Sequence, residues 1–402
     1  MMASTKLRTQ VAIVGAGPAG LTLSCLLHGA GIESVVLENR SRRYVEGRIR
    51  AGVLEQGTVE VLDAAGVGER MHREGIVHHG IYLQFAGERH RIPLSDLAGG
   101  RSIVIYGQTE VVKDLIDARL DAGLELRFGV QDVSVHDIET DLPRVHFTHE
   151  HEQFELEADA IVGADGFHGV CRPAIEQHLR VFSREYPFAW LGILAAAPPS
   201  SDELVYAHHE RGFALLSLRS PERSRLYLQC AADERLEEWS DTRIWDELHR
   251  RVSLDGWNLI EGEVLEKGIT PMRSFVCEPM AHGRLFLAGD SAHIVPPTGA
   301  KGLNLAISDV TVLADALVDS FATGGSRTGL AEYSQTCLRR VWRAEHFSYW
   351  MTTMLHQLGD DPFDNQLQLS QLRYIVSSEA AARTLAENYV GLPIGHGAVS
   401  AA

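Results

Sequence analysis

The 402-residue sequence predicts a mixed α/β (α+β) fold: a Rossmann-type nucleotide-binding domain, an inserted and mainly antiparallel β-sheet, and a helical C-terminal region. A glycine-rich turn joins a β-branched run to a helix-like segment near the N-terminus. Short strand-like runs separated by polar turns follow residue 182, and helical periodicity dominates from residue 300. We expect domains at 1–180, with a small β excursion at about 80–95, at 181–283 and at 284–402.

The N-terminal elements form a β-α-β unit. Residues 10–14 are a short apolar run typical of a buried parallel strand, and residues 34–37 form a second such run. Between them, leucines at helical spacing follow the turn at residues 15–20. The second strand ends in Glu38, at the distance where a carboxylate accepts ribose hydroxyl groups in dinucleotide-binding proteins.

Each glycine of the turn has a physical role in binding a dinucleotide. Gly15 permits the tight turn, Gly17 lets the backbone approach a pyrophosphate, and Gly20 lets helix and strand pack closely. The helix N-terminus adds free N–H groups and a positive dipole end. The turn alone does not distinguish FAD from NAD.

Further elements follow in order. Residues 49–76 are predicted to be helical, residues 80–93 alternate like antiparallel strands, and residues 109–122 form an amphipathic helix. Buried strands are expected at 158–165 and 284–290. The runs of the inserted sheet are 188–196, 203–207, 212–218 and 224–231, and the final helices end near Tyr389.

Two later motifs indicate FAD. Asp165 ends a strand within Gly163-Ala-Asp-Gly-Phe-His-Gly169, and Asp290 follows Gly289 at the end of another. Residues 292–304 then lead into a helix whose N-terminus would stabilise negative charge on a reduced flavin. The ordered set Gly-x-Gly-x-x-Gly, Asp-Gly and Gly-Asp resembles the group A flavoprotein monooxygenases, which implies FAD as the cofactor.

The resemblance extends in register from residue 10 to residue 393. It includes segments 48–57, 106–110, 186–192, 211–215, 293–304 and 387–393. It implies hydroxylation of 4-hydroxybenzoate to 3,4-dihydroxybenzoate (protocatechuate) with O2 and NAD(P)H, through a flavin C4a-hydroperoxide.

The resemblance also implies which side chains bind the substrate. Arg219 would pair with the carboxylate, assisted by Ser217 and Tyr227; residues 217 and 219 are two apart on a predicted strand and are expected to face one side. Without the resemblance, a surface arginine beside a solvated serine is the simpler interpretation.

A second group of side chains is implied to act on the phenol. Tyr206 and Tyr389 would form a hydrogen-bonded relay, His78 would end the proton path, and the carbonyl of Pro297 would contact the substrate hydroxyl. On its own, each tyrosine would be interpreted as a packed aromatic residue, and His78 as a surface residue.

The implied FAD-binding residues are Gly15, Gly17, Gly20, Glu38, Arg48, Arg50, Gln108, Asp165, Arg225, Asp290, Leu303 and Asn304. Arg225 matches a position linked to flavin motion and to the reduced pyridine nucleotide. Because the sequence holds no second Rossmann unit, NAD(P)H is expected to bind transiently at the surface. Arg40, Arg42, Arg43 and Tyr44 favour NADPH, although NADH stays open and the charges could be those of a solvated loop.

The composition limits the kinds of partner and the cellular compartment that we expect for this protein. A net charge of −17 disfavours nucleic acid. The five cysteines form no Cys-x-x-Cys pair, so we expect a reducing, cytoplasmic compartment and no metal. No apolar run is long enough to span a membrane, and the resemblance implies a homodimer.

Three alternative functions remain open at this stage. The first is hydroxylation of another phenolic acid, such as 3-hydroxybenzoate or an aminobenzoate. The second is an FAD dehydrogenase or reductase that does not use oxygen, and the third is a flavoprotein without enzymatic activity.

Overall fold

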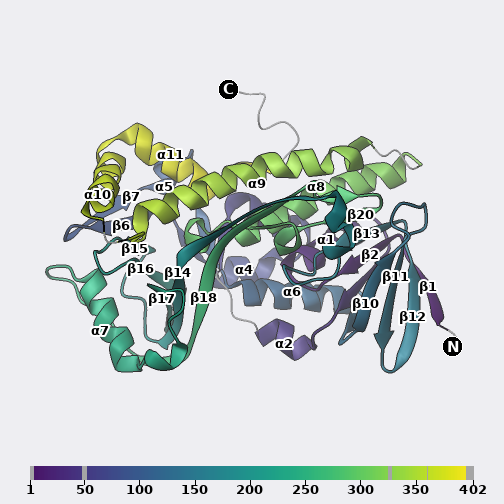
Figure 1. Cartoon of the computed structure of the whole chain (residues 1–402), viewed down its shortest axis with the longest axis horizontal. Coiled ribbons are helices and arrows are strands. Elements are labelled where there is room, and N and C mark those ends of the chain that lie inside the picture. Colours follow the sequence, from purple (N-terminus) through teal and green to yellow (C-terminus); the bar gives the residue numbers. More distant parts are fainter. Residues whose placement is uncertain (1–3, 48–51, 325–327, 360, 395–402) are drawn as a thin grey trace.

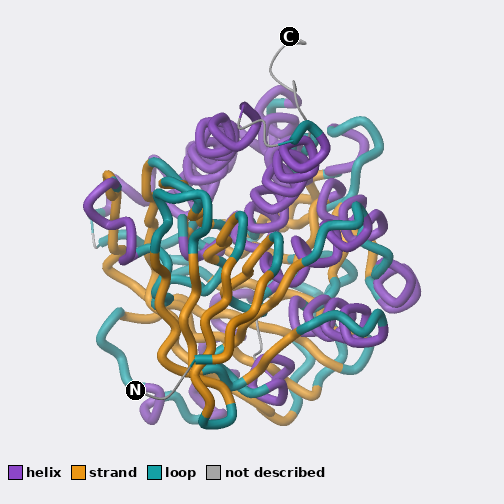
Figure 2. The backbone as a smooth tube through the Cα atoms, turned by 90° about the vertical axis from the view of Figure 1, so that its right-hand side faces the viewer, coloured by secondary structure: helices purple, strands orange, loops and turns teal. Residues whose placement is uncertain are grey.

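The structure is a computed structural model that describes residues 4–47, 52–324, 328–359 and 361–394. Its strands form sheets of six, eight, four and three strands, and long helices lie along the upper side in the view of Figure 1. Figure 2, seen from the right-hand side of that view, shows strands stacked below these helices. The predicted α/β class is confirmed.

The six-stranded sheet is the nucleotide-binding sheet. Every neighbouring pair is parallel except β19 with β20. Its order is β19 (Ala281–His282), β20 (Leu285–Leu287), β13 (Ala160–Gly163), β2 (Val11–Val14), β3 (Ser34–Glu38) and β9 (Leu126–Phe128).

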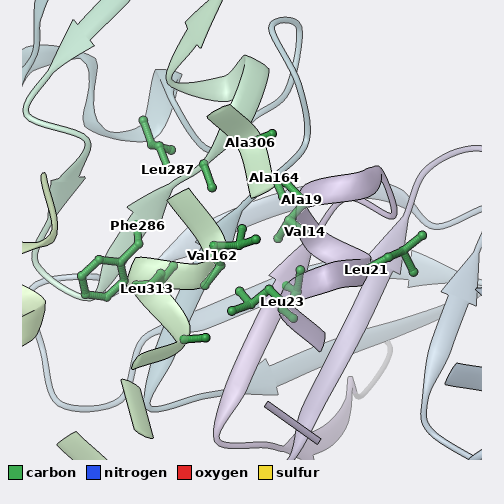
Figure 3. Close-up of a cluster of buried hydrophobic side chains, with 14 of the residues drawn as sticks. Val14, Ala19, Leu21, Leu23, Val162, Ala164, Phe286, Leu287, Ala306 and Leu313 are labelled. Atoms are coloured by element: carbon green, nitrogen blue, oxygen red, sulfur yellow. The ribbon is translucent and has the colours of Figure 1, made fainter. Parts of the chain in front are cut away.

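Helices α1 (Pro18–Gly29), α6 (Gln108–Asp121) and α8 (Gly302–Ala322) accompany this sheet. Pro18 suits the first turn of α1 because the first helical N–H groups have no intrahelical acceptor. Figure 3 shows Val14, Leu23 and Val162 packed with side chains of β20 and α8. This apolar core fixes the turns at the carboxyl ends of β2, β13 and β20 in one place.

The eight-stranded sheet carries the inserted region. Its order is β21 (His293–Ile294), β18 (Glu263–Glu278), β14 (Arg180–Ala196), β17 (Arg223–Ala231), β16 (Ala214–Ser220), β15 (Val205–Ala207), β6 (Ile81–Phe85) and β7 (Glu88–Ile92). One face packs with α7 (Asp241–Val252), where Leu191, Leu216 and Ile244 are buried. The other face packs against the C-terminal helices, where Trp190 and Leu385 are buried.

The hairpin β6–β7 shows that residues 80–93 are antiparallel strands, as expected. It also joins the eight-stranded sheet, because β6 pairs in parallel with β15. The predicted division into 1–180, 181–283 and 284–402 therefore remains a proposal about domains, with this hairpin crossing from the first to the second.

The expectation that residues 49–76 are helical, with breaks at Gly57 and Gly66, was wrong in part. The described residues form β4 (Val53–Glu55), α3 (Gln56–Ala64), α4 (Gly68–Glu74) and β5 (Ile76–His78). Strands β4 and β5 both pair with β8 (Ile103–Ile105), a partner some distance along the chain that local periodicity does not reveal.

The other elements complete the fold. The four-stranded sheet has the order β1 (Thr5–Arg8), β12 (Glu152–Glu157), β11 (Arg144–His149) and β10 (Gln131–His136). The predicted C-terminal helices are α8, α9 (Thr328–Leu355), α10 (Pro362–Ser377) and α11 (Glu379–Val390). Shorter helices are α2 (Arg42–Gly47), α5 (Leu94–Leu97), η1 (Pro173–His178), η2 (Leu236–Glu238), η3 (Gly289–Ser291) and η4 (Pro297–Gly299). Among the described helices, none is long and apolar enough to cross a membrane.

Candidate active site

The glycine turn after β2 has the shape that the sequence predicts. Gly15 has φ +108°, and a Cβ there would lie 2.3 Å from the Ala164 carbonyl oxygen. A Cβ at Gly20 would lie 2.1 Å from the Gly15 oxygen, so Gly20 is required by the packing of α1 on its own turn. At Gly17 a Cβ would meet only the Ala164 oxygen at 4.0 Å. The protein itself leaves this position open, as expected where a ligand approaches the backbone.

Glu38 lies at the carboxyl end of β3, and Asp165 follows the carboxyl end of β13; these are the two strands on either side of β2. Glu38 accepts hydrogen bonds from the backbone N–H groups of Ala16 and Arg40, both at 2.8 Å. The Oδ2 atom of Asp165 accepts the N–H groups of Val170 and Cys171, which shapes the loop after β13. Its Oδ1 atom is buried and has no partner among the described residues, and burial raises the pKa of this carboxyl. An unpaired buried oxygen here fits a cofactor with hydroxyl groups.

Asp290 and the start of α8 lie at the end of β20. Asp290 is exposed in η3. The first N–H groups of a helix have no intrahelical acceptor, and α8 begins without a side-chain cap that would accept from them. Leu303 is half-buried in that turn. The Asn304 side chain is used within the protein: it donates to the carbonyls of Val53 and Ala300 and accepts from Glu55 N and Thr58 Oγ1.

Of the other residues predicted to contact the flavin, Gln108 lies in the described part of the chain. Arg48 and Arg50 lie outside the described residues. Gln108 is half-buried and begins α6, directly after Gly107. A Cβ at Gly107 would lie 2.1 Å from the Arg219 guanidinium, so this glycine makes room for that side chain.

Every residue predicted to bind the substrate lines one cavity, which has a volume of about 50 Å3. Ser217, Arg219, Tyr227, Tyr206 and Pro297 all line it, together with Arg225. Apolar walls come from residues that the sequence did not single out: Val53, Ile105, Trp190, Leu204 and Leu215.

The strand register explains why these side chains meet. Tyr206 on β15 is opposite Leu215 on β16, and Leu215 is opposite Tyr227 on β17. Ser217 is opposite Arg225 in the same ladder. Since directly opposed residues point to one face, the ladder places all of them on the side facing the C-terminal helices.

Arg219 reaches the cavity in a way that the spacing argument did not foresee. The register shifts between Leu218 and Ser220, which leaves Arg219 as the extra residue of a β-bulge. A bulge breaks strict alternation, so two-residue spacing from Ser217 does not determine its direction. The tertiary structure nevertheless brings both side chains to the same cavity.

The two arginines of the cavity are poorly compensated. Within the described parts of the chain neither Arg219 nor Arg225 forms an ion pair, although Glu110 attracts Arg219 from a distance. Nη1 of Arg225 is buried without a hydrogen bond. Burial lowers the pKa of Arg219, because the charged guanidinium loses hydration. Arg225 Nε contacts the Tyr227 hydroxyl at 3.4 Å. Such a site favours an anionic ligand.

Tyr206 and Tyr389 form a buried pair behind the cavity. Their hydroxyl oxygens are 2.5 Å apart, and both side chains are 1% exposed. Burial raises the pKa of both phenols, so both are neutral at ordinary pH. Each hydroxyl can donate one proton and accept another, which makes the pair suited to proton transfer.

His78 is buried rather than at the surface. It is 1% exposed, and neither ring nitrogen has a hydrogen-bond partner among the described residues. Burial lowers its pKa to about 4, although Glu203 and Asp202 act in the opposite direction. The ring is therefore neutral at pH 7, and burial disfavours its protonated form. No described hydrogen bond joins it to Tyr389.

Pro297 is exposed at the cavity, and its carbonyl oxygen accepts the Ala300 N–H at 2.9 Å. A carbonyl has a second lone pair, so one further hydrogen bond remains available to a ligand.

Lys301 was not singled out from the sequence, and the structure places it beside the tyrosine pair. Its Nζ atom donates to Glu55 Oε1 at 2.6 Å and to the Tyr389 carbonyl oxygen at 3.0 Å. Arg340 contacts the other oxygen of Glu55 at 3.1 Å. This buried network joins β4, α8 and the end of α11 beside the tyrosine pair; the partners are distant in sequence, so no local pattern reveals them.

Comparison with known proteins agrees with these features. Residues 8–348 match the family model described as FAD binding domain. The chain is 50% identical to p-hydroxybenzoate hydroxylase of Acinetobacter baylyi, over 96% of both proteins. It is 25% identical to 6-hydroxynicotinate 3-monooxygenase of Bordetella bronchiseptica, over 86% of this chain and 93% of the relative.

Solved structures show the same fold. The chain superposes on p-nitrophenol 4-monooxygenase of Pseudomonas putida with a TM-score of 0.83, 19% identity, and coverage of 96% of this chain and 99% of the other.

Proposed function

The chain belongs to the FAD-binding family of aromatic hydroxylases that includes p-hydroxybenzoate hydroxylase, and from this premise we propose that it hydroxylates 4-hydroxybenzoate to 3,4-dihydroxybenzoate. The reaction consumes O2 and NADPH. The supporting observation is one cavity that is lined by a half-buried arginine and by one member of a buried tyrosine pair.

Features of the chain fit FAD. The open backbone at Gly17 suits a pyrophosphate, and the unpaired Oδ1 of Asp165 suits a hydroxyl donor. The exposed carboxylate of Asp290 and the first turn of α8, with Leu303 and Asn304, would hold the ribityl chain and the ring. When bound, FAD would relay two electrons from NADPH and activate O2, so that one oxygen atom enters the product and the other leaves as water.

Arg219 would hold the benzoate carboxylate. Its planar fork can donate two hydrogen bonds to a carboxylate, and Ser217 and Tyr227 add hydroxyl donors in the same cavity. Binding an anion also compensates the buried positive charge.

The distance along β16 fits a para-substituted ring. Tyr206 is opposite Leu215, and Arg219 lies four residues further on, about 13 Å at roughly 3.3 Å per residue. The arginine side chain reaches part of this distance, and a ring with its carboxylate and hydroxyl at opposite ends would span the rest.

Tyr206 would accept a hydrogen bond from the substrate phenol and pass the proton towards Tyr389. Because both tyrosines are neutral, each would release one proton as it receives another. His78, neutral at pH 7, would take the proton further along this path. Before this transfer, the second lone pair of the Pro297 carbonyl would accept the single substrate O–H in place of Tyr206 and so orient it.

The choice of NADPH rests on the segment after Glu38. Arg42 is paired with Glu46 at 2.5 Å and with Asp117 at 2.6 Å, so it is already compensated. Arg40 lies over the Tyr44 ring, 5.2 Å from its centroid. Arg40 and Arg43 are therefore the better candidates to bind a 2′-phosphate.

A coupled assay tests the function. Purified protein with FAD and NADPH is mixed with 4-hydroxybenzoate, 3-hydroxybenzoate or 4-aminobenzoate, and NADPH oxidation and the product are followed. We expect 4-hydroxybenzoate to accelerate oxidation and to yield the catechol acid. If only one of the other acids accelerates NADPH oxidation and gives a hydroxylated product, that acid is the substrate in place of 4-hydroxybenzoate. Electron transfer without an oxygenated product would indicate a dehydrogenase.

Two further expectations concern the cellular location and the oligomeric state of the protein. All five cysteines are free, which supports a reducing, cytoplasmic location. A homodimer is supported by apolar side chains exposed along α10, where Phe363, Leu367 and Tyr374 are 66%, 55% and 56% exposed. Sedimentation analysis tests the dimer.

A further inference from the structure

Three side chains from distant parts of the sequence meet at the edge of the nucleotide-binding sheet. Glu139 follows β10, His178 ends η1, and His282 lies in β19. One ligand atom from each lies within 4.8 Å of the other two. Among the described residues this is the one such group that combines histidine and carboxylate side chains, and the proposed hydroxylation does not use it.

The contacts within the group are close. Glu139 Oε1 is 2.7 Å from His282 Nε2. The rings of His178 and His282 stack with centroids 3.5 Å apart and planes at 10°. The Gln177 amide nitrogen is 3.1 Å from Nε2 of His178, so an ion bound through that nitrogen would displace the amide.

The backbone holds these side chains together. Arg284 N donates to the Ile138 oxygen at 2.6 Å, which ties the turn carrying Glu139 to the strand after His282. A Cβ at Gly283 would lie 2.3 Å from the same oxygen, and its φ of +60° suits glycine, so Gly283 permits this close approach. His282 is paired with Leu285 in the β19–β20 ladder.

We propose that Glu139, His178 and His282 form a binding site for a divalent transition metal of the zinc class. Two imidazoles and one carboxylate are ligands that Zn2+ takes, with water in the fourth position of a tetrahedron. Mg2+ and Ca2+ prefer oxygen ligands and are disfavoured by two nitrogens. The proposal departs from the expectation of no metal, which rested on the cysteines alone.

Such an ion would join three segments of the nucleotide-binding domain. Segment η1 follows the loop shaped by Asp165, and β19 leads through β20 to Asp290. Metal binding to the folded chain alone would therefore raise the stability of this domain.

The test uses untagged, FAD-loaded protein treated with a chelator and then dialysed. Zn2+ binding is measured by calorimetry, Co2+ binding by the visible absorption of the ion, and stability by the Tm with and without Zn2+. The variants are His178→Ala, His282→Ala and Glu139→Gln. His249→Ala is the matched control, because His249 Nε2 lies 2.6 Å from Glu261 Oε1 in an exposed pair that is not part of this group.

We expect a single Zn2+ equivalent, the absorption of tetrahedral Co2+, and a Tm that rises with Zn2+. Each histidine variant should weaken affinity by more than about tenfold, the least that loss of an outer-shell partner costs at metal sites. His249→Ala should bind as the parent does. Absence of binding, binding that survives in the double variant lacking His178 and His282, or equal weakening by His249→Ala would overturn the site. None of these readouts requires turnover, so they are independent of the hydroxylase assay.

Discussion

The hydroxyl oxygens of Tyr206 and Tyr389 lie 2.5 Å apart although the two residues are separated by 183 positions in the chain. Tyr206 comes from the short strand β15, and Tyr389 from the last turns of α11. The contact exists because α11 packs on the face of the eight-stranded sheet that carries Tyr206, with Leu385 and Ala386 buried in the same apolar cluster. It joins a side chain that lines the cavity to a second buried hydroxyl group, as the proposed proton relay requires.

Replacing Tyr206 by Phe should separate binding from hydroxylation. The variant should keep FAD and a folded structure, since only one hydroxyl is lost. Product formation should fall by about 100-fold or more, the lower range for a lost proton-transfer group, and NADPH oxidation should yield H2O2 instead. The ratio of product to NADPH consumed measures this.

Tyr186→Phe is the control for that experiment, because Tyr186 bonds to Ser274 at 3.3 Å, outside the cavity. It should keep the parent coupling ratio. Unchanged coupling in Tyr206→Phe would remove the relay role of Tyr206.

Arg219→Ala should weaken substrate binding and leave the free protein at least as stable. Truncating one partner of a buried charge pair costs about 3 kcal/mol, or roughly a 100-fold rise in Kd. In the absence of substrate the guanidinium has no ion-pair partner among the described residues, so its removal relieves a desolvation cost. Titration of flavin fluorescence with 4-hydroxybenzoate gives the Kd, and thermal unfolding gives the stability.

Arg219→Lys controls for charge. A single ammonium lacks the planar fork, so binding should fall between those of the parent and the alanine variant. An unaltered Kd in Arg219→Ala would exclude the carboxylate anchor.

Gly17→Ala and Gly20→Ala should fail in different ways. A Cβ at Gly17 meets only one atom, at 4.0 Å, and Gly17 has an ordinary φ of −76°, so this variant should fold and lose FAD affinity. A Cβ at Gly20 would lie 2.1 Å from the Gly15 oxygen, so that variant should unfold at a lower temperature even without FAD. Tm of the FAD-free proteins and FAD titration distinguish the two. Equal FAD affinity of Gly17→Ala and parent would contradict the predicted approach of the pyrophosphate.

Arg43→Ala, alone or with Arg40→Ala, should raise the KM for NADPH and leave the KM for NADH unchanged. The reason is that these arginines have no carboxylate partner among the described residues, unlike Arg42. Arg42→Ala serves as the comparison and should have the smaller effect on NADPH. Steady-state kinetics with NADPH and with NADH measures the difference. If all three variants changed the KM for both nucleotides equally, this segment would not discriminate NADPH from NADH.

Glu345 should make stability depend on pH. It is 6% exposed, and burial raises its pKa from 4.5 to about 7. The folded protein therefore holds a proton that the unfolded chain releases between pH 4.5 and 7, and stability from this group is lost as pH rises through that range. At about 1.4 kcal/mol per pH unit the contribution is about 3 kcal/mol.

Glu345→Gln removes this titration. The variant should be more stable than the parent at pH 8 and should approach it at pH 5, as measured by denaturant unfolding at both values. A constant difference between the two proteins across this pH range would show that the carboxyl is ionised in the folded state.

Local sequence patterns were sufficient to predict the nucleotide-binding unit. A parallel strand, a glycine turn and a helix follow one another there within about thirty residues, and Gly15 to Glu38 lie as expected. The resemblance supplied the cavity residues by position in the chain, and all five lie in one cavity.

The surroundings of those residues could not be predicted in the same way, because they depend on long-range packing. The bulge at Arg219, the burial of His78 and the network of Lys301 with Glu55 arise from partners that are distant in sequence. The group of Glu139, His178 and His282 likewise shows no ligand spacing in the sequence. Periodicity reports which face of an element is apolar, whereas charge compensation, pKa and metal geometry depend on which faces meet. That is fixed by long-range packing, so it could not be read from local pattern.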